Sequence, residues 1–224
     1  MQVDWTKCTQ CGECTRVCYP GALKMSGEWI SAAEVLAQIE KEQPFFAASC
    51  GGVTLSGGEA TAQADFATAF LRGCRALGIH TALETNGCAH WQIYQELMSV
   101  VDLFLYDLKL MDDVRHRELT GASNQLALRN LGRLVTSGSR VIVRVPCIPG
   151  LNDDEANIRA TAAFASQAGV EEMHLLPYNS SAGAKYDWLG RDYEWNGLER
   201  QTAEKMEALA AICQAQGLKV QVEG

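Results

Sequence analysis

The chain has 224 residues, the size of one large domain or of one domain with a small additional unit. Its 27 acidic residues outnumber its 19 basic residues, which gives a formal net charge of −8, and no cluster of lysine or arginine offsets this charge locally. The balance argues against a nucleic-acid partner, because phosphate backbones attract basic surfaces. The first residues lack the apolar stretch of a signal peptide, and no apolar run is long enough to span a bilayer. We therefore expect a cytoplasmic protein with no membrane partner, whose nine cysteines are free thiols or metal ligands and not disulfides.

A run of four cysteines lies between Lys7 and Leu23, with the spacing C-x2-C-x2-C-x3-C and a proline close behind. In bacterial ferredoxins this run holds a [4Fe-4S] cluster, while the fourth cysteine serves a second cluster that is supplied by a second run. Zinc sites usually separate two C-x2-C pairs, so the compact spacing favours an iron–sulfur cluster over zinc. The sequence contains no second run. The predicted metal ligands are Cys8, Cys11, Cys14 and Cys18.

From about residue 31 onward one unit recurs: an apolar strand, a polar loop, an amphipathic helix and a glycine. Such a glycine stands where the end of a helix requires a left-handed residue, at Gly78, Gly138, Gly169 and Gly217. Alternating strands and helices predict parallel strands joined by right-handed crossovers. Periodicity alone favours a doubly wound open sheet and a (β/α) barrel equally. We expect strands near residues 52–56, 79–84, 102–107, 140–145, 171–176 and 218–222.

Polar residues follow five of these strands directly, and their position favours the barrel. The stretches are S-G-G-E (56–59), E-T-N-G (84–87), D-L-K (107–109), R-V-P-C-I-P-G (144–150) and P-Y-N (177–179). The carboxyl ends of parallel strands meet at the functional face of a (β/α) barrel, where side chains from several strands build one site. We therefore expect the strand ends to line one cavity, with contributions from Gly57, Glu84, Asp107, Arg144 and Tyr178.

The stretch S-G-G-E has a functional and a structural interpretation. Gly57 and Gly58 would let a ligand approach the backbone, whose exposed N–H and C=O groups can bind a zwitterionic group. An isolated G-G-E is more often only a tight turn.

The charged residues at the strand ends also leave two interpretations open. Glu84 and Asp107 would place two carboxylates together, which is costly unless a cation or Lys109 lies between them. A purely structural network of carboxylates and lysine fits the same pattern. Arg144 is either a bidentate clamp for a ligand carboxylate or the residue that neutralises Glu59 or Glu84.

The remaining cysteines show no ligand spacing among themselves, and none of the four histidines pairs at metal spacing. Cysteines outside a ligand pattern usually behave as small buried hydrophobic residues. We interpret five cysteines in this way: Cys50, Cys74, Cys88, Cys147 and Cys213.

Taken in order, these stretches closely resemble the activating enzymes of glycyl radical enzymes, which are radical SAM proteins of the pyruvate formate-lyase activase type. After the cysteine run, the resemblance rests on G-G-V-T-L-S-G-G-E-A, I-H-T-A-L-E-T-N-G, D-L-F-L-Y-D-L-K, V-I-V-R-V-P-C-I-P-G-L-N-D and H-L-L-P-Y-N, and it covers nearly the whole chain. It implies an α/β fold: an incomplete (β/α)6 TIM-like radical SAM barrel over residues 31–224, preceded by half of a ferredoxin-like insert over residues 1–30.

The resemblance also implies an enzyme activity, that of an oxidoreductase. In this family a [4Fe-4S] cluster held by C-x3-C-x2-C cleaves S-adenosyl-L-methionine (SAM) reductively, and the resulting 5′-deoxyadenosyl radical takes hydrogen from a glycine of the partner glycyl radical enzyme. A flavodoxin or a ferredoxin would be the reductant.

Several residues acquire roles through the resemblance. Gly57–Glu59 would meet the amino group of the methionine moiety of SAM, and Lys109 would meet its carboxylate. Glu84, Thr85 and Asp107 resemble the site where some members hold a monovalent cation beside the cofactor, although Glu84 stands where aspartate is frequent. The implied cofactor-binding residues are Gly57, Gly58, Glu59, Glu84, Thr85, Asp107, Lys109, Arg144 and Asn179.

The sequence departs from the family pattern in two respects. Asn179 follows P-Y where the pyruvate formate-lyase activase has a histidine that contacts the cofactor. No C-x3-C-x2-C occurs in the 224 residues, although in this family it follows the first barrel strand and precedes the ferredoxin insert. We therefore expect the chain to begin inside a domain, without the first strand, and to be inactive alone, and we assign no catalytic residue.

Two other classes of function are compatible with parts of the sequence. A short protein of this kind could be a non-catalytic iron–sulfur protein that binds SAM or a partner. A stand-alone electron carrier is disfavoured, because electron transfer requires none of the polar strand ends. The sequence does not identify the glycyl radical enzyme, since specificity would lie on loops such as residues 180–195.

Overall fold

The computed structural model describes residues 3–188 and 190–222. The chain divides into two compact units. The smaller unit consists of Met1–Ser31 and Asn179–Leu198, and the larger unit consists of Ala32–Tyr178 and Glu199–Gly224. No helix among the described residues is both long enough and apolar enough to cross a bilayer. The assignment of residues 1–30 to a partial ferredoxin-like insert and of residues 31–224 to the barrel stays a prediction.

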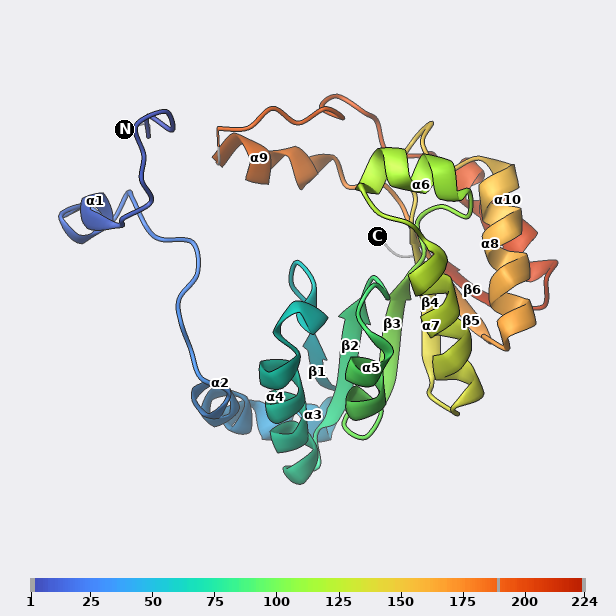
Figure 1. Cartoon of the computed structure of the whole chain (residues 1–224), viewed down its shortest axis with the longest axis horizontal. Helices are drawn as coiled ribbons and strands as arrows, with labels where there is room; N and C mark the ends of the chain where they lie inside the picture. The colour runs from blue at the N-terminus through green and yellow to red at the C-terminus, as the bar shows by residue number, and fades with distance from the viewer. Residues whose placement is uncertain (1–2, 189, 223–224) are drawn as a thin grey trace. The chain divides into compact units, whose positions relative to one another are not determined.

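The larger unit is built on a parallel sheet of six strands in the part of the chain that the structure describes (Figure 1). The strand order is β1-β2-β3-β4-β5-β6, so every strand lies beside the next one in the sequence. This order excludes the doubly wound sheet, in which the order reverses, and confirms the incomplete barrel. The sheet is open, since among the described residues β1 and β6 are its two edges. The strands are β1 (Gly52–Leu55), β2 (His80–Thr85), β3 (Leu103–Asp107), β4 (Val141–Pro146), β5 (Glu172–Leu176) and β6 (Lys219–Val222), each within one residue of its prediction at either end.

Helices connect the strands, and α4, α5, α7, α8 and α10 lie along one face of the sheet (Figure 1). The predicted helix-ending glycines are confirmed, because all four adopt the left-handed conformation, with φ of 72° at Gly78, 81° at Gly138, 90° at Gly169 and 83° at Gly217. The helical segments of this unit are α2 (Ala32–Ile39), η1 (Glu40–Glu42), α3 (Gln43–Ser49), η2 (Ala60–Gln63), α4 (Ala64–Ala76), α5 (Trp91–Leu97), α6 (Asp113–Thr120), α7 (Gln125–Thr136), α8 (Glu155–Ala168) and α10 (Ala203–Gln214), where η marks a 3-10 turn.

The two faces of the sheet differ in chemistry because successive strand residues point to opposite sides. Most of the residues that face the helices are apolar and buried, and the core that they form includes Leu83, Phe104, Tyr106, Val143 and Leu175. The residues between them point to the other side, which we call the inner face. Charged side chains lie on the inner face toward the carboxyl ends of the strands, at Glu84, Asp107 and Arg144.

Asp102, one residue before β3, ties the start of β2 to helix α4. Its Oδ2 accepts hydrogen bonds from the backbone N of Thr81 at 2.9 Å and from Thr81 Oγ1 at 3.0 Å, and its Oδ1 accepts one from Arg75 Nη1 at 2.8 Å. Partial burial opposes the charged form, but the hydrogen bonds from Thr81 and the charge of Arg75 outweigh it and lower the pKa of Asp102. A carboxyl whose pKa is lower in the folded state stabilises the fold above its unfolded pKa, near 4, and loses this effect as pH falls further.

We expect Asp102→Asn to lower the free energy of unfolding by about 1–3 kcal/mol at pH 7, the usual cost of leaving a buried donor without its partner. The difference from the native chain should shrink as pH falls below about 5, because the carboxyl of the unfolded chain becomes protonated first and that of the folded chain at lower pH. Urea unfolding across this range measures both quantities, with the exposed Asp192→Asn as control. A difference that is the same at pH 3 and pH 7 would contradict the role of the charge.

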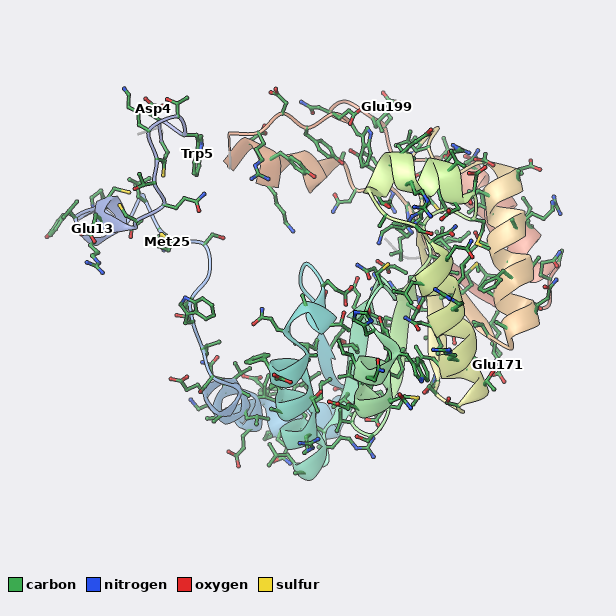
Figure 2. The ribbon with its side chains drawn as sticks, viewed as in Figure 1. Asp4, Trp5, Glu13, Met25, Glu171 and Glu199 are labelled. Carbon is green, nitrogen blue, oxygen red and sulfur yellow. The ribbon has the colours of Figure 1, made fainter. Side chains whose placement is uncertain are left out.

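The smaller unit holds the cysteine run together with residues 179–198. Its helical segments are α1 (Glu13–Arg16), η3 (Ser180–Gly183) and α9 (Ala184–Trp188). Trp5 lies so close to Gly190 that a Cβ at Gly190 would meet the indole ring. Figure 2 shows Met25 beside the helix that carries Glu13, and its Sδ is within contact distance of a Cβ placed on Gly12. Trp5 thus connects the N-terminal segment to residues 179–198 inside this unit.

Candidate functional site

The charged residues at the strand ends of the larger unit form one cluster. Arg144 Nη1 on β4 lies 2.9 Å from Glu84 Oε1 on β2, and Ser56 Oγ, just past β1, donates to Glu84 Oε2 at 2.6 Å. Lys109 Nζ lies 3.4 Å from Asp107 Oδ2 at the end of β3. The structure thus confirms that the polar ends of β1, β2, β3 and β4 converge, and it shows that Arg144 neutralises Glu84.

Asp107 is the most perturbed member of this cluster. Burial raises its pKa, the charge of Lys109 opposes this effect, Glu84 adds to it and Arg144 opposes it, so that the net pKa lies above the usual value. Asp107 Oδ1 and Arg144 Nε are buried and have no hydrogen-bond partner among the described residues. Buried polar atoms are nearly always paired, so these two atoms are the ones that a bound ligand would satisfy.

The carboxylate of Glu59 is hydrogen-bonded within the protein, and its predicted contact with the methionine amino group stays a prediction. Its Oε1 accepts hydrogen bonds from Thr61 N at 3.1 Å, Thr61 Oγ1 at 2.6 Å and Thr85 Oγ1 at 2.9 Å, and its Oε2 accepts one from Asn86 N at 2.8 Å. Both oxygens are therefore used within the protein, where they fasten the G-G-E loop to the end of β2. The backbone at Gly57 and Gly58 stays open, since a Cβ placed on either glycine would find no described atom within 4 Å.

The side chain of Thr85 does not join the cluster of Glu84 and Asp107. It is buried on the helix side of β2, where its hydroxyl pairs with Tyr94 OH at 2.9 Å and donates to Glu59. The reason is the alternation of strand residues: Glu84 faces inward, so Thr85 faces the helices. The expected grouping of three side chains around a cation is therefore reduced to Glu84 and Asp107.

Two buried asparagines position Lys109, and the sequence reasoning assigned no role to them. Asn152 Nδ2 donates to the carbonyl oxygens of Lys109 at 2.9 Å and Pro146 at 2.8 Å, and Asn157 Nδ2 donates to Lys109 O at 3.3 Å. Both asparagines follow Lys109 by more than 40 residues in the sequence, and their hydrogen bonds fix its backbone carbonyl group. The asparagine in the stretch I-P-G-L-N-D was the available signal for Asn152.

A cavity of about 210 Å³ lies beside Asp107 and Lys109. Other residues that line it include Asn86, Cys88 and His116. Although Cys88 is an exposed residue, partial desolvation of its thiol raises the thiol pKa, while the charge of Lys109 lowers it and that of Glu59 raises it. These charges place all three residues at the same end of the sheet.

The interpretation of five cysteines as buried is correct for three of them. Cys74, Cys147 and Cys213 are buried, whereas Cys50 and Cys88 are exposed. Cys50 ends helix α3 in the left-handed conformation with φ of 52°, and Cys88 follows β2 in the loop beside the cavity. Both lie where the chain leaves a regular element, and such positions are usually at the surface.

The predicted cluster ligands lie in the smaller unit. Cys8 Sγ accepts a hydrogen bond from Gln10 N at 3.4 Å, and Cys18 Sγ accepts one from Leu23 N at 3.3 Å. Hydrogen bonds from Glu13 N and the Thr9 side chain lower the pKa of Cys11, which favours the thiolate that metals bind. Within residues 3–188 and 190–222, no three histidine, cysteine, aspartate or glutamate residues are close enough together to hold a metal ion. Cysteine thiolates are suitable ligands for iron, but no three of the four thiols lie close enough together in the described structure to hold a metal ion.

Asn179, the other predicted contact of the cofactor, also belongs to the smaller unit. It is exposed, and its side chain accepts a hydrogen bond from Ser181 N at 3.0 Å at the start of η3. Its contact with the cofactor stays a prediction. Tyr178, in the larger unit, is buried, and its backbone N donates to Gln201 Oε1 at 2.9 Å.

Comparison with known proteins identifies the family. The sequence profile of the radical SAM superfamily matches residues 7–162. The chain is 39% identical over 216 residues to the isethionate sulfite-lyase activating enzyme of Nitratidesulfovibrio vulgaris, a match that covers 94% of this chain and 70% of that protein. It is 35% identical over 206 residues to the trans-4-hydroxy-L-proline dehydratase activating enzyme of Clostridioides difficile, which covers 91% of this chain and 68% of that protein.

A solved structure agrees with these relatives. The crystal structure of a domain of the pyruvate-formate lyase-activating enzyme from Bacteroides vulgatus superposes with a TM-score of 0.66 at 30% identity. The superposition covers 78% of this chain and 99% of that domain. The chain therefore belongs to the radical SAM superfamily and, within it, to the activating enzymes of glycyl radical enzymes.

Proposed function

We propose that this chain binds SAM at the carboxyl ends of β1 to β4, as part of an enzyme that activates a glycyl radical enzyme. The observation that carries the proposal is the pair of buried, unpartnered atoms, Asp107 Oδ1 and Arg144 Nε, beside an open glycine backbone and a lysine in the described structure. A zwitterionic ligand with further polar groups matches this set of donors and acceptors. A purely structural network would rarely leave two buried polar atoms of adjacent residues without a partner.

The residues of this site would contact different polar groups of SAM according to their charge. The open backbone at Gly57 and Gly58 would accept hydrogen bonds from the amino group of the methionine moiety. The Lys109 ammonium would pair with its carboxylate, at a position fixed by Asn152. Asp107 Oδ1 and Arg144 Nε would supply one further acceptor and one further donor. Glu59 would act indirectly, because its hydrogen bonds hold the glycine loop in place.

The cysteine run suits an iron–sulfur cluster by the chemistry and spacing of its donors. Cys8, Cys11, Cys14 and Cys18 would hold at most one [4Fe-4S] cluster, which, when bound, carries electrons delivered by a flavodoxin or a ferredoxin. The 224 residues contain no C-x3-C-x2-C. We therefore propose that this chain by itself binds SAM without cleaving it, and that its protein partner is a glycyl radical enzyme.

The test is SAM binding to the anaerobically prepared chain, measured by calorimetry, with chromatography of the same samples for 5′-deoxyadenosine after addition of a strong reductant. We expect Lys109→Met to bind SAM about 10- to 100-fold more weakly, because it loses a hydrogen bond between charged groups. The exposed Lys41→Met serves as control and should bind as the native chain does. Equal affinity of native chain and Lys109→Met would refute the site. Release of 5′-deoxyadenosine that depends on Cys14 would refute the proposed inactivity.

A further inference from the structure

We infer that the guanidinium of Arg144 is the cation of the carboxylate pair Glu84 and Asp107, so that this chain requires no monovalent metal ion there. The inference concerns the site of the proposed function, and its consequence for SAM affinity rests on that function. Its structural basis is the ion pair of 2.9 Å between Arg144 Nη1 and Glu84 Oε1.

The two carboxylates need a positive charge close to them. Glu84 and Asp107 lie on adjacent strands, at the carboxyl end of the inner face, and the charge of Glu84 disfavours the ionised form of Asp107. Their exposed side-chain fractions are 30% and 19%, so water screens the repulsion only in part. Some cation must therefore belong to the resting site.

Arg144 pairs with Glu84 and lies beside Asp107 because of where β4 places it. It is the register partner of Asp107 on β3, so the two side chains start about 5 Å apart on the same face. Its guanidinium then crosses β3 to reach Glu84 on β2, a span of two strand spacings, about 10 Å. Glutamate at position 84 is one methylene longer than aspartate, and this length helps the two side chains to meet.

The same contacts leave few ligands for a metal ion. Glu84 uses one oxygen for Arg144 and the other for the Ser56 hydroxyl at 2.6 Å. Thr85 faces the helices, where its hydroxyl bonds Glu59 and Tyr94. Among the side-chain oxygens of the three residues expected around a cation, one carboxylate oxygen of Asp107 has no partner in the described structure. The side chains of these three residues therefore offer a metal ion one unpaired oxygen in the described structure.

The charge balance points the same way. Glu84 and Asp107 contribute two negative charges, and Arg144 and Lys109 contribute two positive charges, so the cluster is neutral without a metal ion. An added metal ion would leave a positive charge in a partly buried site that is proposed to receive the sulfonium of SAM. The guanidinium keeps its charge at every relevant pH. Arg144 thus holds Glu84 in place through its Nη1, while its Nε and Asp107 Oδ1 stay available to the ligand.

The experiment compares thermal unfolding and SAM affinity in sodium, potassium and choline chloride at equal ionic strength. We expect the native chain to show the same Tm and the same affinity in all three salts. Arg144→Met should lower the Tm in choline chloride by about 5–15 °C, because it leaves the partly buried Glu84 without its cation beside Asp107. Sodium or potassium should recover part of this loss, and should strengthen SAM binding to Arg144→Met by about tenfold or more relative to choline.

Three further variants make the test specific. Arg144→Lys keeps the positive charge but loses the planar guanidinium with its several N–H donors. It should show an intermediate Tm with little dependence on the salt. Glu84→Gln with Arg144→Met removes both charges, so its Tm should exceed that of Arg144→Met in choline chloride and should not respond to sodium or potassium. Arg159→Met removes an exposed arginine whose ion pair with Glu155 is 3.8 Å long, and it should behave as the native chain does.

The inference would be overturned if sodium or potassium, compared with choline, raised the Tm of the native chain by several degrees or its SAM affinity several-fold. An Arg144→Met variant that is destabilised equally in all three salts would overturn it too. If SAM binds none of the variants in any salt, the proposed function fails, and the Tm series alone decides whether Arg144 replaces the metal ion.

Discussion

Glu59→Gln is expected to destabilise the larger unit by about 3–4 kcal/mol and to free the G-G-E loop. The carboxylate accepts four hydrogen bonds, from Thr61 N, Thr61 Oγ1, Thr85 Oγ1 and Asn86 N. A glutamine offers one acceptor oxygen and turns an N–H2 group toward a donor, so at least one donor loses its partner. Hydrogen bonds to charged groups contribute about 1.5–3 kcal/mol each, and an unsatisfied buried donor costs about 1–3 kcal/mol. Urea unfolding measures the loss.

Two comparisons show whether the hydrogen bonds carry this effect. Thr61→Val removes only the shortest of the four contacts, 2.6 Å, and should cost about 1–3 kcal/mol. The double variant should be less destabilised than the sum of the two single variants by about 1 kcal/mol, since both remove the same contact. Glu96→Gln, an exposed residue of α5, controls for the change of charge. If Glu59→Gln weakens SAM binding without a loss of stability, Glu59 contacts the ligand directly and our assignment is wrong.

Gly87→Ala should be as damaging, by about 2–5 kcal/mol, for a steric reason. Gly87 follows β2 with φ of 77°, a conformation that costs alanine about 1–2 kcal/mol. A Cβ at this position would also collide with the hydroxyl and ring of Tyr106. Tyr106 is fully buried, and its hydroxyl donates to Ala127 O at 2.6 Å, so it cannot move aside easily. Overpacking of this kind costs about 1–3 kcal/mol more.

Gly78→Ala is the matched control for the collision. Gly78 has nearly the same φ, 72°, but a Cβ there would meet no described atom within 4 Å, so it should cost only the conformational part. Tyr106→Phe removes the atom nearest to the new Cβ, and in combination with Gly87→Ala it should cost less than the two single changes together. Equal losses for Gly87→Ala and Gly78→Ala, measured by denaturant unfolding, would show that Tyr106 yields and that the steric argument fails.

The strands and helix ends of this fold could be predicted from local sequence patterns. The apolar runs of β1 to β6 predicted every strand to within one residue, and four of the six runs follow a glycine that adopts positive φ. The convergence of Glu84, Asp107 and Arg144 was also predictable, since parallel strands bring their carboxyl ends to one edge. These inferences need only chain order and the alternation of strand residues.

The hydrogen-bond partners of individual side chains could not be predicted from local patterns. The sequence suggested a ligand contact for Glu59, but it did not predict its hydrogen bonds to Thr85 and Asn86, which lie 26 and 27 residues away. Asn152 holds the backbone of Lys109 from 43 residues away, and Cys88 is exposed although its residue type favours burial. Hydrogen bonds of this kind depend on distances of about 3 Å between loops, which no periodicity in the sequence records.

The amino-acid sequence by itself therefore determined the parallel strands, the helix ends and the set of charged residues at the strand ends, because each depends on local conformation and strand direction. Only the tertiary structure decided how these charges pair: Arg144 with Glu84 across β3, and Glu59 with the end of β2. The physical reason is that a charged side chain selects its partner by reach and orientation in three dimensions, and both are set by the packing of elements that are distant in sequence.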